Sequence, residues 1–561
     1  MKKNSVKIVI SILITLVLAG IYFYVALPSI NVFDQSFWVF MLLTVACFAL
    51  IFTLLNAKTT AKTSQTKGRA QAKKKLFAFE GSTVVKVAAG IAAVPLAVLL
   101  LGNLLSSTFF NAEKYSNIIE VPEAVFEEDM PETTVVSNIA LMDSDTAQIM
   151  GKRTLGALSD VVSQYEINPA YKQINYKGAP QKVSNLEYAD FFKWLSNRAN
   201  GIPGYVMVDP VNVTEANYVK LEKTIKYADS AFFDEDLHRA LRFSYPTKIF
   251  GSYSFELDEA GNPYYVVSCM SPKVFMFGAM DVSEVVIFDP ISGNSAIYAL
   301  DETPSWVDNV FTGALASQKY DWYGTLKNGF WNSIIGNRDC KVTTDDFGYI
   351  VRGDDVFFFT GVTSVTSDES NIGFITSNAR TGEYKFYPVI GAEEYSAMLA
   401  AEGEVQEKGY VASFPSLINV SGEATYIMVL KDTGGLVKLY ALVNVEKYSI
   451  VATGSTQTEA KQAYIALLKE NNIISGDVPE VPNAPATLTA NIIVANIRFA
   501  TVNGESVVYI TASDGNLYKQ IVAVDESVML ISIGDELNIS YYDTEIDKIK
   551  QIEKWGFKLS K

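Results

Sequence analysis

Few residues in this chain have the types and spacing that catalysis needs. The single histidine, His238, stands in the acidic stretch 234–239, and Ser–His–Asp or Cys–His catalysis needs a histidine held by a carboxylate. The chain has no G-x-S-x-G nucleophile motif, Walker motif or Rossmann glycine motif. One histidine and three cysteines offer no recognisable zinc spacing. We therefore expect no catalytic residues, no metal ligands and no cofactor, and interpret His238 as an ordinary helix-face histidine.

Carboxylate chemistry is harder to exclude. The pairs Asp345-Asp346 and Asp354-Asp355 flank a probable strand, and two carboxylates can cleave a glycosidic bond when one of them has a raised pKa. Adjacent aspartates at turns are, however, common as solvated loop residues. The pairs also lack the D-x-D-x-D-G spacing of a calcium loop. A carboxylate-dependent hydrolase of cell-wall glycan or peptide therefore remains an alternative function.

Three aromatic residues and two cysteines are the other candidate site residues. Trp322, Tyr323 and Trp331 lie close together in sequence among amide side chains, a composition that can stack on sugars or anchor a partner, although core packing also explains it. Cys269 and Cys340 could form one disulfide in an oxidising compartment. A chain of this size has enough core to leave them unpaired.

The elements that must position these residues begin with three long apolar runs. Residues 8–27, 37–55 and 87–105 are each 19 or 20 residues long, close to the number that a helix needs to cross about 30 Å of hydrocarbon. A helix satisfies its own backbone hydrogen bonds, which lipid cannot do. We therefore predict a membrane domain over residues 1–110 with three transmembrane helices.

Charge predicts the orientation of these helices. Residues 1–111 have a net charge of +9, with the lysines and arginines before the first run and between residues 56 and 86, whereas residues 112–561 carry −25. Short loops rich in Lys and Arg stay in the cytoplasm. We expect a multi-pass protein of the cell membrane with a cytoplasmic N-terminus and a large extracytoplasmic C-terminal region. The acidic exterior argues against nucleic acid as a partner.

The exterior region divides by composition. Residues 111–136 are dense in acidic residues and proline, which predicts an acidic stalk. A mixed α/β region follows over 137–245. Three prolines mark a linker at 471–486, and residues 487–556 read as five short strands punctuated by glycine, which favours a small β-barrel of OB type.

A strand–turn–strand–helix pattern recurs three times within residues 246–470. The strand pairs fall at 285–300, 373–388 and 439–453, and the helices are expected from Pro304, Ala392 and Thr456. Each amphipathic helix could cover one antiparallel sheet. The predicted fold class is therefore α+β: three transmembrane helices, repeated antiparallel sheet–helix modules, and a C-terminal barrel.

The residues 284–300 and 383–454 resemble the PepSY-type module of bacterial envelope proteins, which often carries a D-x-x-x-G turn; here the turn is Asp289 to Gly293. The whole chain also resembles an uncharacterised family of Gram-positive membrane proteins that is sometimes labelled by colicin V production. Neither resemblance supplies catalytic residues. The PepSY resemblance implies binding or restraint of a partner outside the membrane.

The sequence thus predicts a membrane-anchored, non-catalytic protein of the bacterial cell envelope that binds, scaffolds or regulates another component. Its expected partners are the lipid bilayer and another envelope protein or a wall component. Besides the hydrolase, an accessory subunit of a membrane transport complex is an alternative. A stand-alone transporter would need ionisable residues inside the spans, and these three spans contain no such pair.

Overall fold

The computed structural model of this chain describes residues 2–56, 83–133, 136, 139–211, 216–365, 367–474, 488–502, 505–522, 526–542 and 549–557. The described residues form two units, 1–473 and 474–561. The boundary between the units falls within the predicted linker.

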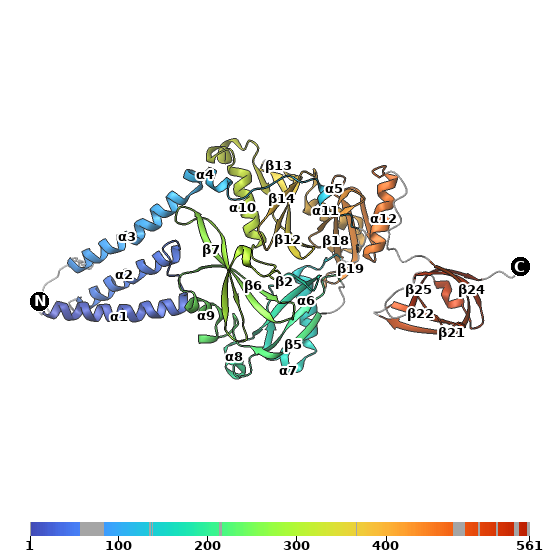
Figure 1. The fold of residues 1–561 in the computed structure, drawn as a ribbon, viewed down its shortest axis with the longest axis horizontal. Helices are drawn as coiled ribbons and strands as arrows, with labels where there is room; N and C mark the ends of the chain where they lie inside the picture. The colour runs from blue at the N-terminus through green and yellow to red at the C-terminus, as the bar shows by residue number, and fades with distance from the viewer. Residues whose placement is uncertain are drawn as a thin grey trace, which may run out of the picture. The chain divides into compact units, whose positions relative to one another are not determined.

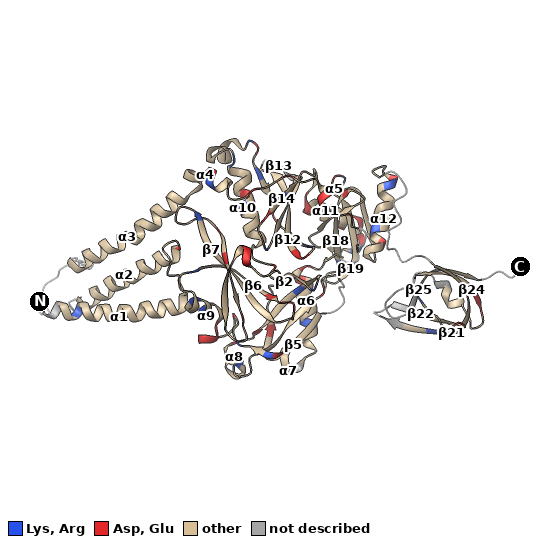
Figure 2. Cartoon of the chain, in the orientation of Figure 1, with Lys and Arg blue, Asp and Glu red and all other residues tan. Residues whose placement is uncertain are grey.

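The three apolar runs form helices α1 (Lys2–Ala26), α2 (Gln35–Asn56) and α3 (Thr83–Ser106). Each is long and apolar enough to cross a membrane, and few of its side chains are buried within the protein. A helix that is apolar on all sides needs an apolar solvent around it. Figure 2 shows the three helices almost free of charged residues, which confirms the predicted anchoring segments. Residues 57–82, with most of the predicted basic loop, lie outside the described residues.

The ends of the helices make hydrogen bonds to the α+β part of the first unit. Arg242 Nε donates to the Leu27 carbonyl at 3.0 Å, and Asn31 Nδ2 donates to the Thr247 carbonyl at 2.8 Å. At the end of α3, the Phe277 amide donates to Ser106 Oγ at 3.0 Å. The C-terminal ends of α1 and α3 therefore contact the same α+β body.

The predicted stalk is wrong as a spacer. Residues 108–133 form α4 (Thr108–Ser116), a packed connection, α5 (Phe126–Asp129) and a final extended segment at 130–133, which we call the strap. The Ala124 amide donates to the Phe386 carbonyl, and the Phe386 amide donates to Pro122, both at 2.9 Å. Ile119, Phe126 and Met130 are buried. The prediction rested on the many acidic residues and gave too little weight to these apolar positions. Their burial supplies the free energy that orders the segment.

The mixed region forms a five-stranded antiparallel sheet of order β1-β3-β4-β5, with β2 paired to β3. Figure 1 shows α6 beside this sheet. The elements are α6 (Ser144–Gly156), α7 (Ser159–Val162), β1 (Tyr165–Ile167), β2 (Lys172–Tyr176), β3 (Ala179–Tyr188), α8 (Phe191–Asn197), β4 (Ile202–Val208), β5 (Ala216–Ile225) and α9 (Leu237–Ser244).

A four-stranded antiparallel meander follows: β6 (Ile249–Leu257), β7 (Pro263–Val274), β8 (Gly278–Phe288) and β9 (Ser295–Ala299). Asp289 closes the β8–β9 turn by accepting from the Ile291 amide at 2.8 Å, and Gly293 takes a positive φ of 79°. A residue without Cβ adopts this conformation at no steric cost. The predicted D-x-x-x-G turn therefore forms.

The helix expected from Pro304 is wrong, because α10 (Gly313–Leu326) begins only after the Thr312 N-cap. Val310 and Phe311 donate their amides to the Ala379 carbonyl, at 3.0 and 2.7 Å, and Glu256 accepts from the Asp308 amide at 2.7 Å. These long-range partners take the amides of the segment in place of helical carbonyls. The helical spacing correctly indicated burial, since Val307 and Val310 are in the core.

The second and third copies of the pattern have the predicted order of strand, turn, strand and helix. Their sheets follow the orders β10-β12-β13-β14 and β16-β18-β19-β20, with β11 and β15 paired to β12 and β13, and β17 paired to β18. The elements are β10 (Lys341–Thr343), β11 (Gly348–Arg352), β12 (Asp355–Ser364), β13 (Ser367–Asn378), β14 (Tyr384–Tyr387), β15 (Gly391–Ala392), α11 (Glu394–Glu404), β16 (Val411–Ala412), β17 (Ser416–Val420), β18 (Glu423–Lys431), β19 (Val437–Asn444), β20 (Val451–Gly454) and α12 (Gln457–Glu470).

The second unit contains five strands, β21 (Leu488–Val502), β22 (Glu505–Ala512), β23 (Leu517–Ile521), β24 (Glu536–Tyr542) and β25 (Ile549–Phe557). They close in the cyclic order β21-β22-β23-β25-β24. The β23–β25 pair is parallel and the other pairs are antiparallel. Val508, Ile510 and Leu537 fill the interior. Taken with the first unit, the fold class is α+β with several antiparallel sheets, as predicted.

Candidate functional site

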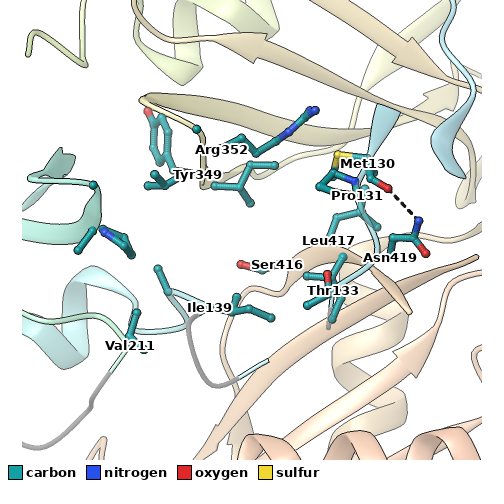
Figure 3. Close-up of a pocket in the computed structure, with 18 of the residues that line it drawn as sticks. Met130, Pro131, Thr133, Ile139, Val211, Tyr349, Arg352, Ser416, Leu417 and Asn419 are labelled. Carbon is teal, nitrogen blue, oxygen red and sulfur yellow. Dashed lines mark hydrogen bonds between the residues drawn. The ribbon is translucent and has the colours of Figure 1, made fainter. Parts of the chain in front are cut away.

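A cleft of about 600 Å³ lies where several segments of the first unit meet. Its walls come from residues 130–133, the β2–β3 turn with the start of β3, β11 and β17, together with Ile139, Ala140, Asp209 and Val211. Figure 3 shows Tyr349 and Arg352 on one side, Ser416 and Leu417 on another, and Ile139 and Val211 on a third. The segments are far apart in sequence, so only the folded chain creates this site.

Two walls of the cleft are edge strands. β11 pairs with β12, and β17 pairs with β18. Within the described ranges, no named strand pairs with the second edge of either one. The strap shows how such an edge binds extended chain: the Thr133 amide donates to the Asn419 carbonyl at 2.8 Å, and Asn419 Nδ2 returns a bond to Met130 at 2.8 Å. The strap therefore covers the β17 edge at Asn419, and the edge of β11 can add a strand from another chain in the same way.

The ionisable groups in the cleft lining do not form an acid–base pair. Among the lining residues these groups are Asp209, Tyr349 and Arg352. Arg352 Nη2 donates to the Asp129 carbonyl at 2.7 Å, and the Tyr349 hydroxyl accepts from the Gly313 amide at 3.1 Å. Burial raises the pKa of Tyr349, which keeps it neutral. The chemistry of this lining therefore suits binding rather than proton transfer.

A smaller cavity of about 150 Å³ also uses Tyr349 as a wall. Lys172, Lys182 and Ser254 line it. Burial lowers the pKa of Lys182 to about 8, although the charge of Asp143 opposes the change. Burial likewise lowers the pKa of Lys172, against the charge of Glu256. These lysines are cationic donors whose charge is costly where they lie.

Two carboxyl groups, Glu256 and Asp308, are buried nearby in the same unit, and no sequence motif marks them. Burial raises the pKa of Glu256, and burial together with the charge of Glu256 raises the pKa of Asp308 to about 9. Asp308 accepts from the Asn175 amide at 2.6 Å. The one available sequence signal was a glutamate inside the apolar strand pattern of β6. Through hydrogen bonds to backbone amides, Glu256 and Asp308 join β6, β2 and the segment before α10. These contacts are those of residues that stabilise the fold.

The four aspartates predicted as alternative catalytic residues do not converge. Asp355 accepts from Arg380 Nε at 2.9 Å, Asp354 accepts from Asn175 Nδ2 at 3.2 Å, and Asp346 accepts from the following amide at 2.8 Å. Asp345-Asp346 precedes β11 and Asp354-Asp355 follows it. Five strand residues span about 17 Å, beyond the roughly 5–9.5 Å between paired glycosidase carboxylates. None of the four lines either cavity described above.

His238 lies on helix α9, in agreement with its interpretation as a helix-face histidine. Its Nε2 is 3.3 Å from Asp229 Oδ1, and its ring packs edge-on against Tyr253. The hydrogen bond to Asp229 raises the pKa of His238, against the effect of burial. The residue does not line the cleft.

Of the two alternatives for Cys269 and Cys340, the structure has the unpaired one: both are free, buried thiols. Cys269 lies on β7 within the core, where burial raises its pKa to about 11. Cys340 Sγ donates to the Thr325 carbonyl at 3.4 Å. The two thiols therefore lie in different environments. The number of residues between two cysteines does not show how far apart they lie in the fold.

The three predicted partner-binding aromatics have separate environments. Trp322 packs edge-on against Tyr115 with ring centroids 5.0 Å apart. Tyr323 lines a different pocket of about 420 Å³, with Lys327 over its ring at 5.6 Å. Trp331 is 64% exposed and packs against Phe109 at 5.9 Å. The aromatics therefore do not form one binding site.

A scan against protein-family models finds no match for this chain, and a search of curated proteins finds no match either. The class of protein is accordingly defined by its own geometry: an α+β protein with three helices long and apolar enough to span a membrane, and a cleft bordered by two edge strands.

Proposed function

We propose that this chain is a membrane-anchored, non-catalytic binding or scaffolding protein of the bacterial cell envelope, whose cleft binds an extended segment of a partner protein. The observation that carries the proposal is the presence of two edge strands, β11 and β17, on a cleft of about 600 Å³. Main-chain hydrogen bonds to such edges supply affinity, and the surrounding side chains supply specificity.

The repeated sheet–helix units support the same interpretation. In the structure the strand pairs β13–β14 and β19–β20 are followed along the chain by α11 and α12, and residues 284–300 and 383–454 resemble the PepSY-type module. That resemblance implies restraint of a partner rather than chemistry. The closed five-stranded unit, which resembles an OB barrel, would supply a second protein-docking surface.

The envelope assignment requires the large region to be extracytoplasmic. We expect a reporter that is active only outside the cytoplasm to be active when it is fused after Lys561. The same reporter fused after Asn56, at the end of α2, should be inactive, because the chain there precedes the third crossing. Activity in the reverse pattern would overturn the assignment.

The binding role predicts position-specific crosslinking in intact cells. Ala179 is exposed and lines the cleft, whereas Ala170 is exposed on the same sheet region and lies outside the lining. A photo-reactive amino acid at Ala179 should give a discrete, protease-sensitive adduct, several-fold stronger than one at Ala170. The variant Ala140→Trp, which fills the cleft, should abolish the Ala179 adduct without unfolding the protein.

Each other result has a defined meaning. Equal adducts at both positions, or an Ala179 adduct that survives Ala140→Trp, would contradict binding in the cleft. An adduct that resists protease but yields to a wall-degrading enzyme would replace the protein partner with a wall glycan. An adduct to a transport subunit would identify the chain as an accessory of that complex.

A further inference from the structure

An exposed apolar cluster lies directly beyond the end of α3. It consists of Phe109 and Phe110 on α4 and Trp331, Ile334 and Ile335 in the connection between α10 and β10, which includes the short helical turn Asn332–Gly336. These five side chains are between 47% and 76% exposed. Single exposed apolar residues are ordinary, but a contiguous cluster of them marks an interaction surface.

Ring contacts hold the two halves of this cluster together. The Phe109 ring lies 5.1 Å from Phe330 and 5.9 Å from Trp331, and it also packs edge-on against Phe110 at 4.7 Å. Phe109 follows the last residue of α3 by only three positions. Figure 1 shows the chain after α10 beside α4. The exposed cluster is therefore tied to the point where α3 ends.

The length and the polar contacts of α3 predict that its C-terminal end lies at a membrane–water boundary. α3 has 24 residues, which correspond to about 36 Å of helix and exceed about 30 Å of hydrocarbon. Its last carbonyls accept from polar side chains: Asn111 Nδ2 donates to Leu105 at 2.7 Å, and Ser107 Oγ donates to Leu104 at 2.6 Å. Asn103 pairs with Gln35 of α2 at 3.0 Å. Polar groups of this kind belong at the headgroups rather than in hydrocarbon.

The same level already carries aromatic residues from the other helices. Tyr22 and Tyr24 lie in the last turns of α1, and Trp38, in the first turn of α2, donates its indole N–H to the Val32 carbonyl at 2.8 Å. Trp and Tyr concentrate at membrane boundaries, where an apolar ring and a polar atom are both satisfied. Trp331 and Phe109 continue this aromatic belt onto the large domain.

Local charge also favours lipid. Between Lys327 and Arg338 the chain contains no acidic residue, whereas residues 112–561 as a whole are strongly acidic. Basic side chains that flank an apolar segment bind anionic headgroups.

We propose that Phe109, Phe110, Trp331, Ile334 and Ile335 form a lipid-binding surface that inserts into the headgroup boundary of the leaflet at which α3 ends. The cluster adds a membrane contact some 225 residues along the chain from α3 and restrains the α+β domain against the bilayer. This contact does not depend on the cleft or on its partner.

The test uses the full chain in lipid nanodiscs that contain a phospholipid spin-labelled near the headgroup, which quenches tryptophan fluorescence within contact range. We expect Trp331→Phe to remove part of the lipid-quenchable emission. Trp306→Phe is the matched control, because Trp306 is partly buried against Tyr264, with ring centroids 5.1 Å apart, and it should leave the lipid-quenchable emission unchanged. Both variants should unfold at the wild-type temperature.

A second pair of variants tests insertion directly. Ile335→Asp should make the Trp331 emission accessible to aqueous acrylamide, whereas Ile390→Asp, at another strongly exposed isoleucine, should not. Two results would overturn the proposal. One is that, in the wild type, the part of the fluorescence due to Trp331 is quenched by acrylamide but not by the spin-labelled lipid. The other is that neither quencher reduces this fluorescence, which would mean that protein covers the cluster.

Discussion

Replacing Lys319 with methionine is expected to lower the free energy of unfolding of the first unit by about 3–5 kcal/mol, because it leaves a buried carboxylate without its partner. Lys319 Nζ donates to Asp281 Oδ1 at 2.9 Å, and the two side chains are only 4% and 12% exposed. The ammonium also lies over the Phe311 ring at 5.0 Å. The pair therefore joins α10 to β8.

A second ion pair on β8 provides the control. Lys248 pairs with Glu284, but both side chains are about one-third exposed, and pairs of this kind contribute about 0–1 kcal/mol. In denaturant unfolding, Lys319→Met should therefore lose much more free energy of unfolding than Lys248→Met. The double variant Lys319→Met/Asp281→Asn should recover part of the loss, because it removes the unpaired charge. Equal losses for Lys319→Met and Lys248→Met would contradict the argument.

The second large effect concerns Glu394, the first residue of α11. Burial raises its pKa from the ordinary 4.5 to about 7, although hydrogen bonds from the Gly361 amide and Thr344 oppose the change. The folded state therefore binds the proton more tightly than the unfolded state. The stability from this group is fully present below about pH 4.5 and is lost as the pH rises through about 7. The pKa difference corresponds to about 3 kcal/mol.

Glu394→Gln should remove this dependence on pH. A glutamine can accept from the Gly361 amide through its side-chain oxygen. Its Nε2 can donate to Thr344 Oγ1 when that hydroxyl gives its own proton to the Gly361 carbonyl instead of to residue 394. We expect the variant to match the wild type at pH 4.5 and to be up to about 3 kcal/mol more stable at pH 8.5. Thr344→Val is the control: it removes one hydrogen-bond partner but keeps the carboxyl, so the slope of stability against pH should persist. A Glu394→Gln protein with the wild-type slope would assign that slope to other groups.

Local patterns were sufficient for the elements whose cause is local. The three apolar runs predicted α1 to α3, because the length and composition of a run alone decide whether it can cross hydrocarbon. The turn at Asp289 to Gly293 formed because one carboxylate and one glycine satisfy it. α12 begins where predicted, with Thr456 Oγ1 accepting from the Glu459 amide at 3.1 Å, since an N-cap needs partners only three residues away.

Other features depended on partners far away in the chain. Residues 304–312 have helical spacing, but their amides bond to Ala379 and Glu256, so they stay outside the helix. Residues 111–136 are acidic enough for a free spacer, but Asp129 is paired by Lys385 at 2.6 Å and the neighbouring Phe126 is buried. Sequence composition does not show whether a charge will find a partner.

The sequence by itself determined the three apolar helices, the α+β character of the chain and its acidic balance. Only the tertiary structure decided the candidate site. The cleft needs Met130, Gln181, Tyr349 and Ser416 together, and the apolar cluster needs Phe109 against Trp331. The physical reason is that apolar periodicity records how much of a segment is buried, whereas the partner against which it is buried depends on long-range packing of the whole domain.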